Sequence, residues 1–238
     1  NIYWLDAYVD INTLPTGAQF GWKTAMSHWN DDAVWSIDNG LNWIELRYPS
    51  NHPYTMDSID LAFAVITGEP TEPEEPNIPN AKYIQWPDLT STGIDIRVDD
   101  GDGVTRHIAD DFPCTTTGLI TDVHLWGSWK NDAKGQIEGF VISFYSDDPC
   151  GPGGSDPDNT YSKPDALLWT HTFEPAEFTE TLYKDLMPEY EWWWDPYVYN
   201  LIQNGDHQVW KYDINIDPED AFMQQGSPTN PKVYWLAI

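Results

Sequence analysis

Two stretches of this chain nearly repeat each other: Ile2-Tyr3-Trp4-Leu5 near the start and Val233-Tyr234-Trp235-Leu236-Ala237-Ile238 at the end. The repeat is offset by 231 positions, from Tyr3 to Tyr234. β-Branched and aromatic residues dominate both stretches and neither contains Gly or Pro, so both are predicted to be β-strands. A strand at one end and its near-copy at the other suggest that one molecule continues where another stops.

The N-terminal copy extends over residues 2–11 as a two-faced strand. Side chains alternate along a strand, and one face is wholly apolar, comprising Tyr3, Leu5, Ala7, Val9 and Ile11. The other face starts with Ile2 and Trp4 and becomes polar further on. Pro15 and Gly17 then interrupt the pattern. An isolated strand of this kind is unstable in water and needs a sheet edge to pair with.

This strand could pair inside its own domain, as most terminal strands do, or it could be donated to another copy. The matching C-terminal strand favours donation, by residues Ile2, Tyr3, Trp4, Leu5, Ala7, Tyr8, Val9 and Ile11. Burying its large apolar side chains would contribute about 1.5–3 kcal/mol each before ordering costs. Because a head-to-tail contact does not close on itself unless the rotation permits, we expect a homo-oligomeric helical filament.

Composition excludes several classes of partner. The 238 residues include 39 Asp and Glu against 11 Lys and Arg, a formal charge of −28. This charge argues against nucleic acid or an anionic membrane surface as a partner. It also opposes close packing of identical copies, so assembly is expected to depend on cations. Fourteen Trp residues indicate rings that fill cores or contact surfaces.

Localisation is expected to be extracellular. The chain begins with Asn rather than Met and shows no charged-then-apolar leader, which we interpret as a removed signal peptide or a sequence given without one. The sequence contains no apolar run long enough to span a bilayer. Two cysteines, Cys114 and Cys150, are predicted to form a disulfide, with two unlinked thiols as the alternative.

Short strands separated by turn signals predict an all-β fold, an antiparallel β-sandwich or jelly-roll-like barrel with very little helix and a protruding N-terminal donor strand. Beyond the donor strand, strands are expected at residues 20–23, 33–37, 43–47, 59–66, 94–98, 119–126, 140–145, 167–169, 209–214 and 233–238. The best helical candidate, residues 217–222, has Asp at the N-cap and Pro at the first position, enough for a turn or two.

Prolines at 70, 73, 76 and 79 divide the chain. Their period of three matches polyproline II, so residues 68–80 are predicted to form a stiff, solvated spacer between two folded pieces. The expected organisation is a donor strand at 1–13, an N-terminal β-region at 14–67, the linker at 68–80 and the main β-domain at 81–238.

Six aromatic-rich or acidic motifs occur along the chain: Phe20-Gly21-Trp22-Lys23-Thr24, His28-Trp29-Asn30-Asp31-Asp32-Ala33-Val34-Trp35, Ser58-Ile59-Asp60-Leu61-Ala62-Phe63, Ala109-Asp110-Asp111-Phe112, residues 120–129 and Val233-Tyr234-Trp235-Leu236. Together these motifs resemble an uncharacterised family of secreted, Trp-rich bacterial β-domains. In that family the Tyr-Trp-Leu strand runs directly into the Phe-Gly-Trp-Lys segment within longer chains, whereas here the junction lies at the N-terminus. The resemblance implies secretion and β-architecture but no reaction. The design also resembles subunits of extracellular fibrils built by donor-strand complementation.

No catalytic constellation is evident. The six histidines and two cysteines lack tight metal-ligand spacing, and no GxSxG, P-loop or GxGxxG occurs. The protein is therefore not expected to be an enzyme or to require a cofactor, although a hydrolase with an unfamiliar acidic site stays open. The loop containing Asp99, Asp100 and Asp102 has a composition suited to Ca²⁺ but not the EF-hand spacing, and a solvated turn is the alternative.

Residues 191–195, Glu-Trp-Trp-Trp-Asp, followed by Tyr197 and Tyr199, suggest a second function. Exposed aromatic rows can stack on sugars, so a secreted carbohydrate-binding β-sandwich module with glycan contacts is the alternative. Against it, Trp192 and Trp194 share one strand face while Trp193 takes the other, as packing positions do. We therefore expect a structural subunit of an extracellular filament, assembled by donation of the N-terminal strand.

Overall fold

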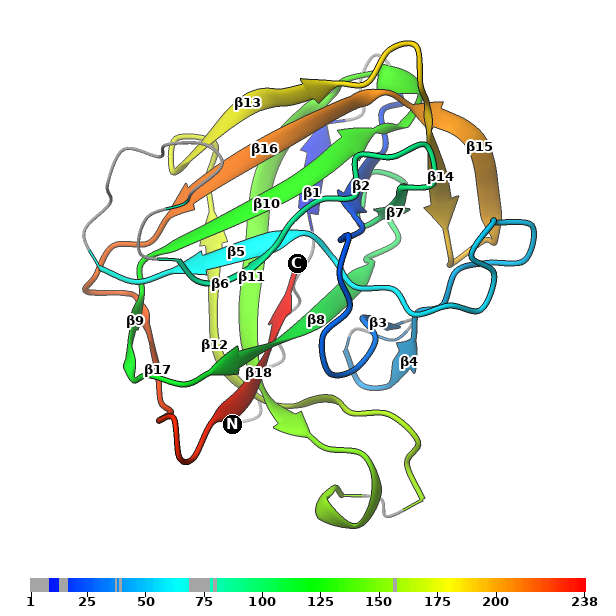
Figure 1. Ribbon diagram of the computed structural model, residues 1–238. Coiled ribbons are helices and arrows are strands. Elements are labelled where there is room, and N and C mark those ends of the chain that lie inside the picture. The colour runs from blue at the N-terminus through cyan, green and yellow to red at the C-terminus, as the bar shows by residue number, and fades with distance from the viewer. Residues whose placement is uncertain are drawn as a thin grey trace.

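The protein is a two-sheet β-sandwich, seen in a computed structural model that describes residues 9–12, 17–36, 38, 40–68, 78, 81–155 and 158–238. In Figure 1 the strands β13, β16, β10 and β5 run obliquely across the upper part of the molecule, and the long β11 and β12 cross behind them. Strand content is high and helix is confined, in the described residues, to two short 3-10 turns at Lys130–Asp132 and Gly151–Gly153. The predicted all-β sandwich is confirmed.

The first sheet has the strand order β1-β11-β18-β8-β3-β4, and β12 pairs with β11. Its members are β1 (Val9–Asn12), β11 (Gln136–Asp148), β18 (Lys232–Ala237), β8 (His107–Cys114), β3 (Val34–Ser36), β4 (Trp43–Glu45) and β12 (Lys163–Phe173). All of its pairs are antiparallel. The C-terminal strand β18 therefore lies inside the sheet, between β8 and β11.

The second sheet has the order β13-β16-β10-β2-β7-β14-β15, with β5 and β6 attached through β10. Its members are β13 (Phe178–Asp185), β16 (Gln208–Asn215), β10 (Asp122–Trp129), β2 (Phe20–Lys23), β7 (Ile94–Arg97), β14 (Glu191–Asp195), β15 (Asn200–Asp206), β5 (Phe63–Ile66) and β6 (Ala81–Gln85). The pair β7–β14 is parallel, which the antiparallel prediction did not include. A small separate sheet joins β9 (Gly118–Ile120) to β17 (Phe222–Gln224).

One continuous aromatic core lies between the sheets, because alternate side chains of both point inward. Its largest members are less than 2% exposed: Phe20, Trp22, Phe112, Trp129, Phe140, Phe144 and Tyr212. Rings meet edge to face, as where Phe20 contacts Tyr212 with centroids 5.3 Å apart. Such packing explains the aromatic-rich composition.

Strands from both sides of the proline-rich segment share this core. In the second sheet β2 lies between β10 and β7, and in the first sheet β3 pairs with β8. The stretches 14–67 and 81–238 thus fold together rather than as two pieces separated by a spacer. Of residues 68–80 the structure describes Gly68 and Ile78, and Ile78 is buried in a smaller cluster with Trp126.

Two local predictions have clear outcomes. Residues 217–222 form a hydrogen-bonded turn, in which Asp220 N donates to Asp217 O at 2.9 Å, and Phe222 already begins β17. The N-terminal strand was predicted to protrude. Its described part, Val9–Asn12, instead pairs with β11 of the same chain, and residues 1–8 lie outside the described residues.

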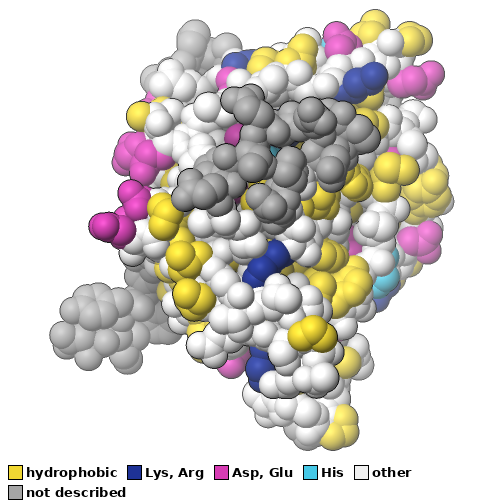
Figure 2. Space-filling view, turned by 60° about the vertical axis from the view of Figure 1, so that its left-hand side comes forward, with side chains coloured by type: hydrophobic (Ala, Val, Ile, Leu, Met, Phe, Trp, Pro, Cys, Tyr) yellow, Lys and Arg dark blue, Asp and Glu magenta, His cyan; other side chains and the backbone are white. Residues whose placement is uncertain are grey.

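Figure 2 shows acidic side chains spread over one face of the molecule, with few Lys or Arg among them. Hydrophobic side chains are visible between them. The excess of acidic side chains fits the sequence, in which acidic residues outnumber basic ones by 39 to 11. No helix in the described part of the chain has the length and apolarity that crossing a bilayer requires.

Candidate functional site

The two terminal strands lie end to end along one edge of β11. β18 pairs with Ser143–Ser146, β1 pairs with residues 136–140, and both are antiparallel to β11. β12 pairs with the other edge of β11, and its pairs include Phe140 and residues 143–145, which also pair with β1 and β18. Because a strand has only two hydrogen-bonding edges, β1 and β18 must share the remaining one. They form a single row that runs from β18 into β1.

The register of this row repeats the offset found in the sequence. Tyr234, Trp235 and Leu236 face Ser146, Tyr145 and Phe144, respectively. Val9 and Asp10 face Phe140 and Gly139. Counting back from Val9 in that register assigns to Tyr3, Trp4 and Leu5 the same three partners that Tyr234, Trp235 and Leu236 already have. The offset between the two registers on β11 thus equals the sequence offset between the two Tyr-Trp-Leu copies.

β18 is firmly held in its place on β11. Leu236 and Ile238 are fully buried in the main core. On the other face Trp235 is also fully buried, and its Nε1 donates to Asp147 Oδ1 at 2.9 Å. Beyond the end of the strand, Ile238 exchanges two backbone hydrogen bonds with Ile108, at 3.1 and 3.2 Å. A segment that replaces β18 must supply matching side chains to this core.

The predicted donor strand is described only at its C-terminal end. Val9 is fully buried, Ile11 is 6% exposed, and both belong to the main core together with Phe140. Their face is the apolar face predicted from the alternation. The remaining predicted donor residues lie outside the described residues: Ile2, Tyr3, Trp4, Leu5, Ala7 and Tyr8. Within a single chain Val9 and Ile11 thus complete their own sheet, and donation to another copy stays a prediction.

Two of the acids in the loop predicted to bind calcium, Asp99 and Asp102, form ion pairs with arginines. Arg97 forms a two-pronged contact with Asp99, both distances 2.9 Å, and reaches Asp195 at 3.1 Å. Arg106 contacts Asp102 at 2.8 Å and Asp195 at 3.0 Å. A calcium ion would compete with these guanidinium groups for Asp99 and Asp102.

Asp100, the third residue of that predicted site, lies beside β1, and its backbone N donates to Val9 O at 3.1 Å. Burial, together with the charge of Asp10, raises the pKa of Asp100 to about 6. Calcium binding in this loop stays a prediction.

Replacing Arg97 with Met is expected to lower the free energy of unfolding by about 3–5 kcal/mol, because it leaves buried carboxylates without their counter-charge. Urea denaturation measures this loss. Lys134→Met serves as the control, since Lys134 is 38% exposed, its partner Glu180 is 26% exposed, and this ion pair is expected to contribute about 1 kcal/mol or less. Equal losses in the two variants would contradict the structural role of Arg97.

The predicted disulfide between Cys114 and Cys150 is not formed. Cys114 is a buried free thiol in β8, whose Sγ donates to Thr116 O at 3.2 Å, and Cys150 is an exposed free thiol after β11. β18 separates β8 from β11. Two strand spacings amount to about 9–10 Å, more than the roughly 7 Å that a disulfide can bridge. The sequence does not reveal that a third strand lies between the two cysteines.

The three consecutive tryptophans of β14 are packing residues, as the strand alternation predicted. Trp192 and Trp194 are 8% and 6% exposed and face the main core, while Trp193 is fully buried on the other face. Gly205 makes room for Trp193, because a Cβ on Gly205 would lie 2.3 Å from the Trp193 Cβ. The three rings therefore offer no exposed row for sugar stacking.

The two tyrosines that follow β14 in sequence are more open to solvent. Tyr197 is 41% exposed and Tyr199 is 58% exposed. One face of the Tyr197 ring meets the guanidinium of Arg106, 5.6 Å from the ring centroid. The structure therefore leaves single exposed rings here rather than a row.

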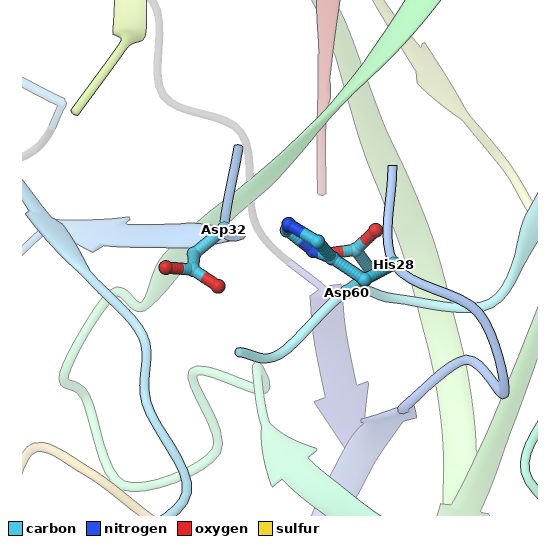
Figure 3. A group of neighbouring side chains, drawn as sticks. All are labelled: His28, Asp32 and Asp60. Carbon is cyan, nitrogen blue, oxygen red and sulfur yellow. The ribbon is translucent and has the colours of Figure 1, made fainter. Parts of the chain in front are cut away.

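A further group of acids gathers where the loops before β3 and β5 meet. His28 and Asp60 point toward each other, with Nδ1 and Oδ1 2.7 Å apart, and Asp32 lies beside them (Figure 3). Asp32 contacts Arg47 at 2.6 Å, and Asp60 also accepts a hydrogen bond from Trp29 N at 2.6 Å. Ligand atoms of the three residues lie within 4.8 Å of one another. Both carboxylates thus already have partners within the protein.

The comparisons with known proteins give one match. The model of a family described as a domain of unknown function (DUF7901) covers residues 1–66 and 81–238. The chain belongs to this family. The interruption in the match coincides with the proline-rich segment, so the family pattern comprises the sheet-forming regions on both sides of it. No curated protein and no solved structure matches the chain.

Proposed function

We propose that this protein is a structural subunit of an extracellular filament, in which each copy donates its N-terminal strand to the β11 edge of another copy. The donated strand would cover residues 136–146 of the acceptor. Val9 and Ile11 would take the places that β1 holds in a single chain, and Tyr3-Trp4-Leu5 would take the places of Tyr234-Trp235-Leu236.

The observation that carries this proposal is the shared register of β1 and β18. Two independent sets of strand pairs place Val9 and Tyr234 in one row, at a spacing that equals the sequence offset between the copies. A strand that repeats another for packing reasons alone would not need to match its register on the same neighbour. Such a match is expected when one segment can replace the other.

In this exchange each contact that a strand gives up is replaced by a similar contact from another copy. Val9 and Ile11 would make in another copy the contacts that they make in their own, which is the low-cost exchange of identical elements that produces domain-swapped assemblies. Tyr3, Trp4 and Leu5 would restore the contacts that β18 gives up. The incoming strand also covers in one piece an edge that two separate segments cover in a single chain. Main-chain hydrogen bonds supply affinity, and alternate side chains fix the register.

The charge of the subunit sets the conditions for assembly. A formal charge of −28 on each copy opposes close approach. Salt at 0.1 M limits such repulsion to about 10 Å, and divalent cations neutralise it further. Filaments are therefore expected to form more readily in salt than at low ionic strength.

Electron microscopy of the purified protein tests the proposed function. Helical filaments are expected at moderate salt, and fewer at low ionic strength. Dispersed single particles under every salt concentration and pH at which the protein stays folded would contradict a filament subunit.

A further inference from the structure

Lys23 is completely buried, an uncommon position for a lysine. It lies on β2 directly opposite Asp95 on β7, and its Nζ is 3.2 Å from Asp95 Oδ2. The same Nζ is 2.8 Å from Glu191 Oε1 at the start of β14. The side chains of all three residues have no solvent exposure. One amine thus stands between two carboxyl groups, away from water.

A third acid completes the group. Asp206 on β15 is the strand partner of Glu191, is 1% exposed, and has no hydrogen-bond partner for either carboxylate oxygen among the described residues. The oxygens of Asp95, Glu191 and Asp206 lie within 4.8 Å of one another, close enough to hold a metal ion. The Lys23 ammonium already sits against two of them, so the cluster has its own cation.

Burial and mutual repulsion keep these acids partly protonated. Burial raises the pKa of Glu191 to about 8, and the charge of Asp95 adds to the effect. Burial likewise raises the pKa of Asp95 and that of Asp206 above the ordinary value. One ammonium can balance one carboxylate, and burial favours the protonated form of the other two acids.

The packing around the amine is tight. Gly93 lies against the cluster, where a Cβ would be 2.5 Å from Glu191 Oε1 and 2.7 Å from Lys23 Nζ. Gly21 lets the buried Trp193 ring approach, and its own Cβ position is 3.1 Å from the Asp95 Cβ. Because neither glycine has a side chain, the Trp193 indole can approach Gly21 and the backbone of Gly93 can approach Lys23 and Glu191. The Lys23 side chain has no exposure to bulk solvent.

We propose that Lys23 and Asp95 condense to an isopeptide bond that joins β2 to β7, with Glu191 carrying the proton. Transfer of one proton from the ammonium to the Asp95 carboxylate gives a neutral amine and a neutral carboxylic acid. Burial favours this change, but the charges of Asp95 and Glu191 outweigh burial and raise the pKa of Lys23, so the neutral pair is a minor, reactive form. Nζ then attacks Asp95 Cγ and forms the C–N bond.

The remaining protons balance through Glu191. One oxygen of the protonated Glu191 carboxyl gives its proton to the Asp95 hydroxyl, and the other oxygen accepts a proton from Nζ. The C–OH bond breaks and water leaves. An ammonium and a carboxylate have become an amide and one water, and Glu191 ends as it began. No oxidant or other reagent is needed, and the step does not depend on the proposed filament.

Mass spectrometry of the denatured, reduced protein tests the bond. The wild-type chain is expected to be one water lighter than its sequence, and proteolysis is expected to yield a branched peptide that contains both Lys23 and Asp95. The branched peptide is the deciding result, because succinimide formation at an Asp also removes one water. Glu191→Gln, which keeps the size of the side chain, is expected to restore the full mass in a protein whose circular dichroism is unchanged.

Lys211→Arg is the matched control. Lys211 is 6% exposed and its Nζ lies 3.2 Å from Asp213 Oδ1, but Asp213 is more open to solvent, so this variant should keep the branched peptide. Folded wild-type protein of full sequence mass, with Lys23 and Asp95 in separate peptides, would overturn the proposal. This result does not require that any variant fold.

Discussion

Replacing Leu5 with Asp is expected to abolish filaments and leave a folded subunit. In the register of β1, Leu5 would take the place of Leu236, which is fully buried in the main core. A carboxylate there loses its hydration without gaining a partner, a cost of several kcal/mol for each contact between copies. In a single chain β18 holds the place, so thermal stability should change little. Negative-stain microscopy and thermal melting measure the two effects.

Two comparisons sharpen this test. Leu236→Asp puts the same charge into β18 and is expected to destabilise the single chain itself. Asp6→Ala should act in the opposite direction and increase filament yield, because Asp6 would take the place of the buried Ala237. Abundant filaments from Leu5→Asp, or from a chain without residues 1–12, would contradict strand donation.

The second large effect is a fall in stability as the pH rises from about 6.5 to 9. Burial, reinforced by the charges of Asp60 and Asp147, raises the pKa of Asp111 to about 9, and burial with Asp60 raises that of Asp110 well above its ordinary value. An acid with a raised folded-state pKa stabilises the fold below its unfolded pKa and loses that contribution as the pH approaches the folded value. Each such group costs about 1.4 kcal/mol per pH unit in this window.

One buried histidine acts in the opposite direction below this window. Burial lowers the pKa of His124 to about 4, so the unfolded chain binds more protons at this residue between about pH 4 and 6.5, which offsets part of the loss from the acids there. Urea denaturation at a series of pH values is expected to show the steepest decline in stability between about pH 6.5 and 9.

Asp111→Asn is the matched variant, because asparagine has nearly the shape of aspartate but its side chain does not ionise. The stability of this variant should depend less on pH, so its advantage over the wild type should grow from pH 6 to pH 9. Glu219→Gln, on the exposed surface, serves as the control for the loss of one acid. A wild-type profile that rises steadily from pH 6.5 to 9 would contradict protonated buried acids.

Alternation of apolar residues predicted the strands that pack against the core. Residues 20–23 were predicted as a strand and form β2 with the same bounds, and residues 140–145 lie within the longer β11. Strands with mostly exposed side chains were missed, because little burial pattern marks them. β13, with Thr and Glu among its residues, is an edge strand of this kind.

The sequence was less informative about charged residues inside the fold. Asp110 and Asp111 occur in a strand that was not predicted, and the acids of residues 99–102 suggested a calcium loop although their partners are arginines. Lys23 ends its strand, and Asp95 alternates with apolar residues in a strand that also contains Arg97, so neither residue stood out in the sequence. Their meeting depends on the pairing of β2 with β7, which only the tertiary structure reveals.

The repeat of Tyr-Trp-Leu was visible in the sequence, but its meaning depends on the register. Sequence alone could not show that β1 and β18 share one edge of β11, because β12 first has to occupy the other edge. Only then do two copies of the motif become alternatives for one place.

Site-specific cross-linking between two differently tagged chains tests strand donation most directly. One chain carries Trp4→Cys and the other Tyr145→Cys, the partner of Trp235 in β11, both with the exposed Cys150 replaced by Ser. Mixed filaments are expected to give a cross-linked heterodimer on mild oxidation, whereas Trp4→Cys with Phe144→Cys, one residue out of register and on the opposite face, should give none. Filaments in which the Trp4–Tyr145 pair does not cross-link, or in which both pairs cross-link equally, would contradict donation in this register.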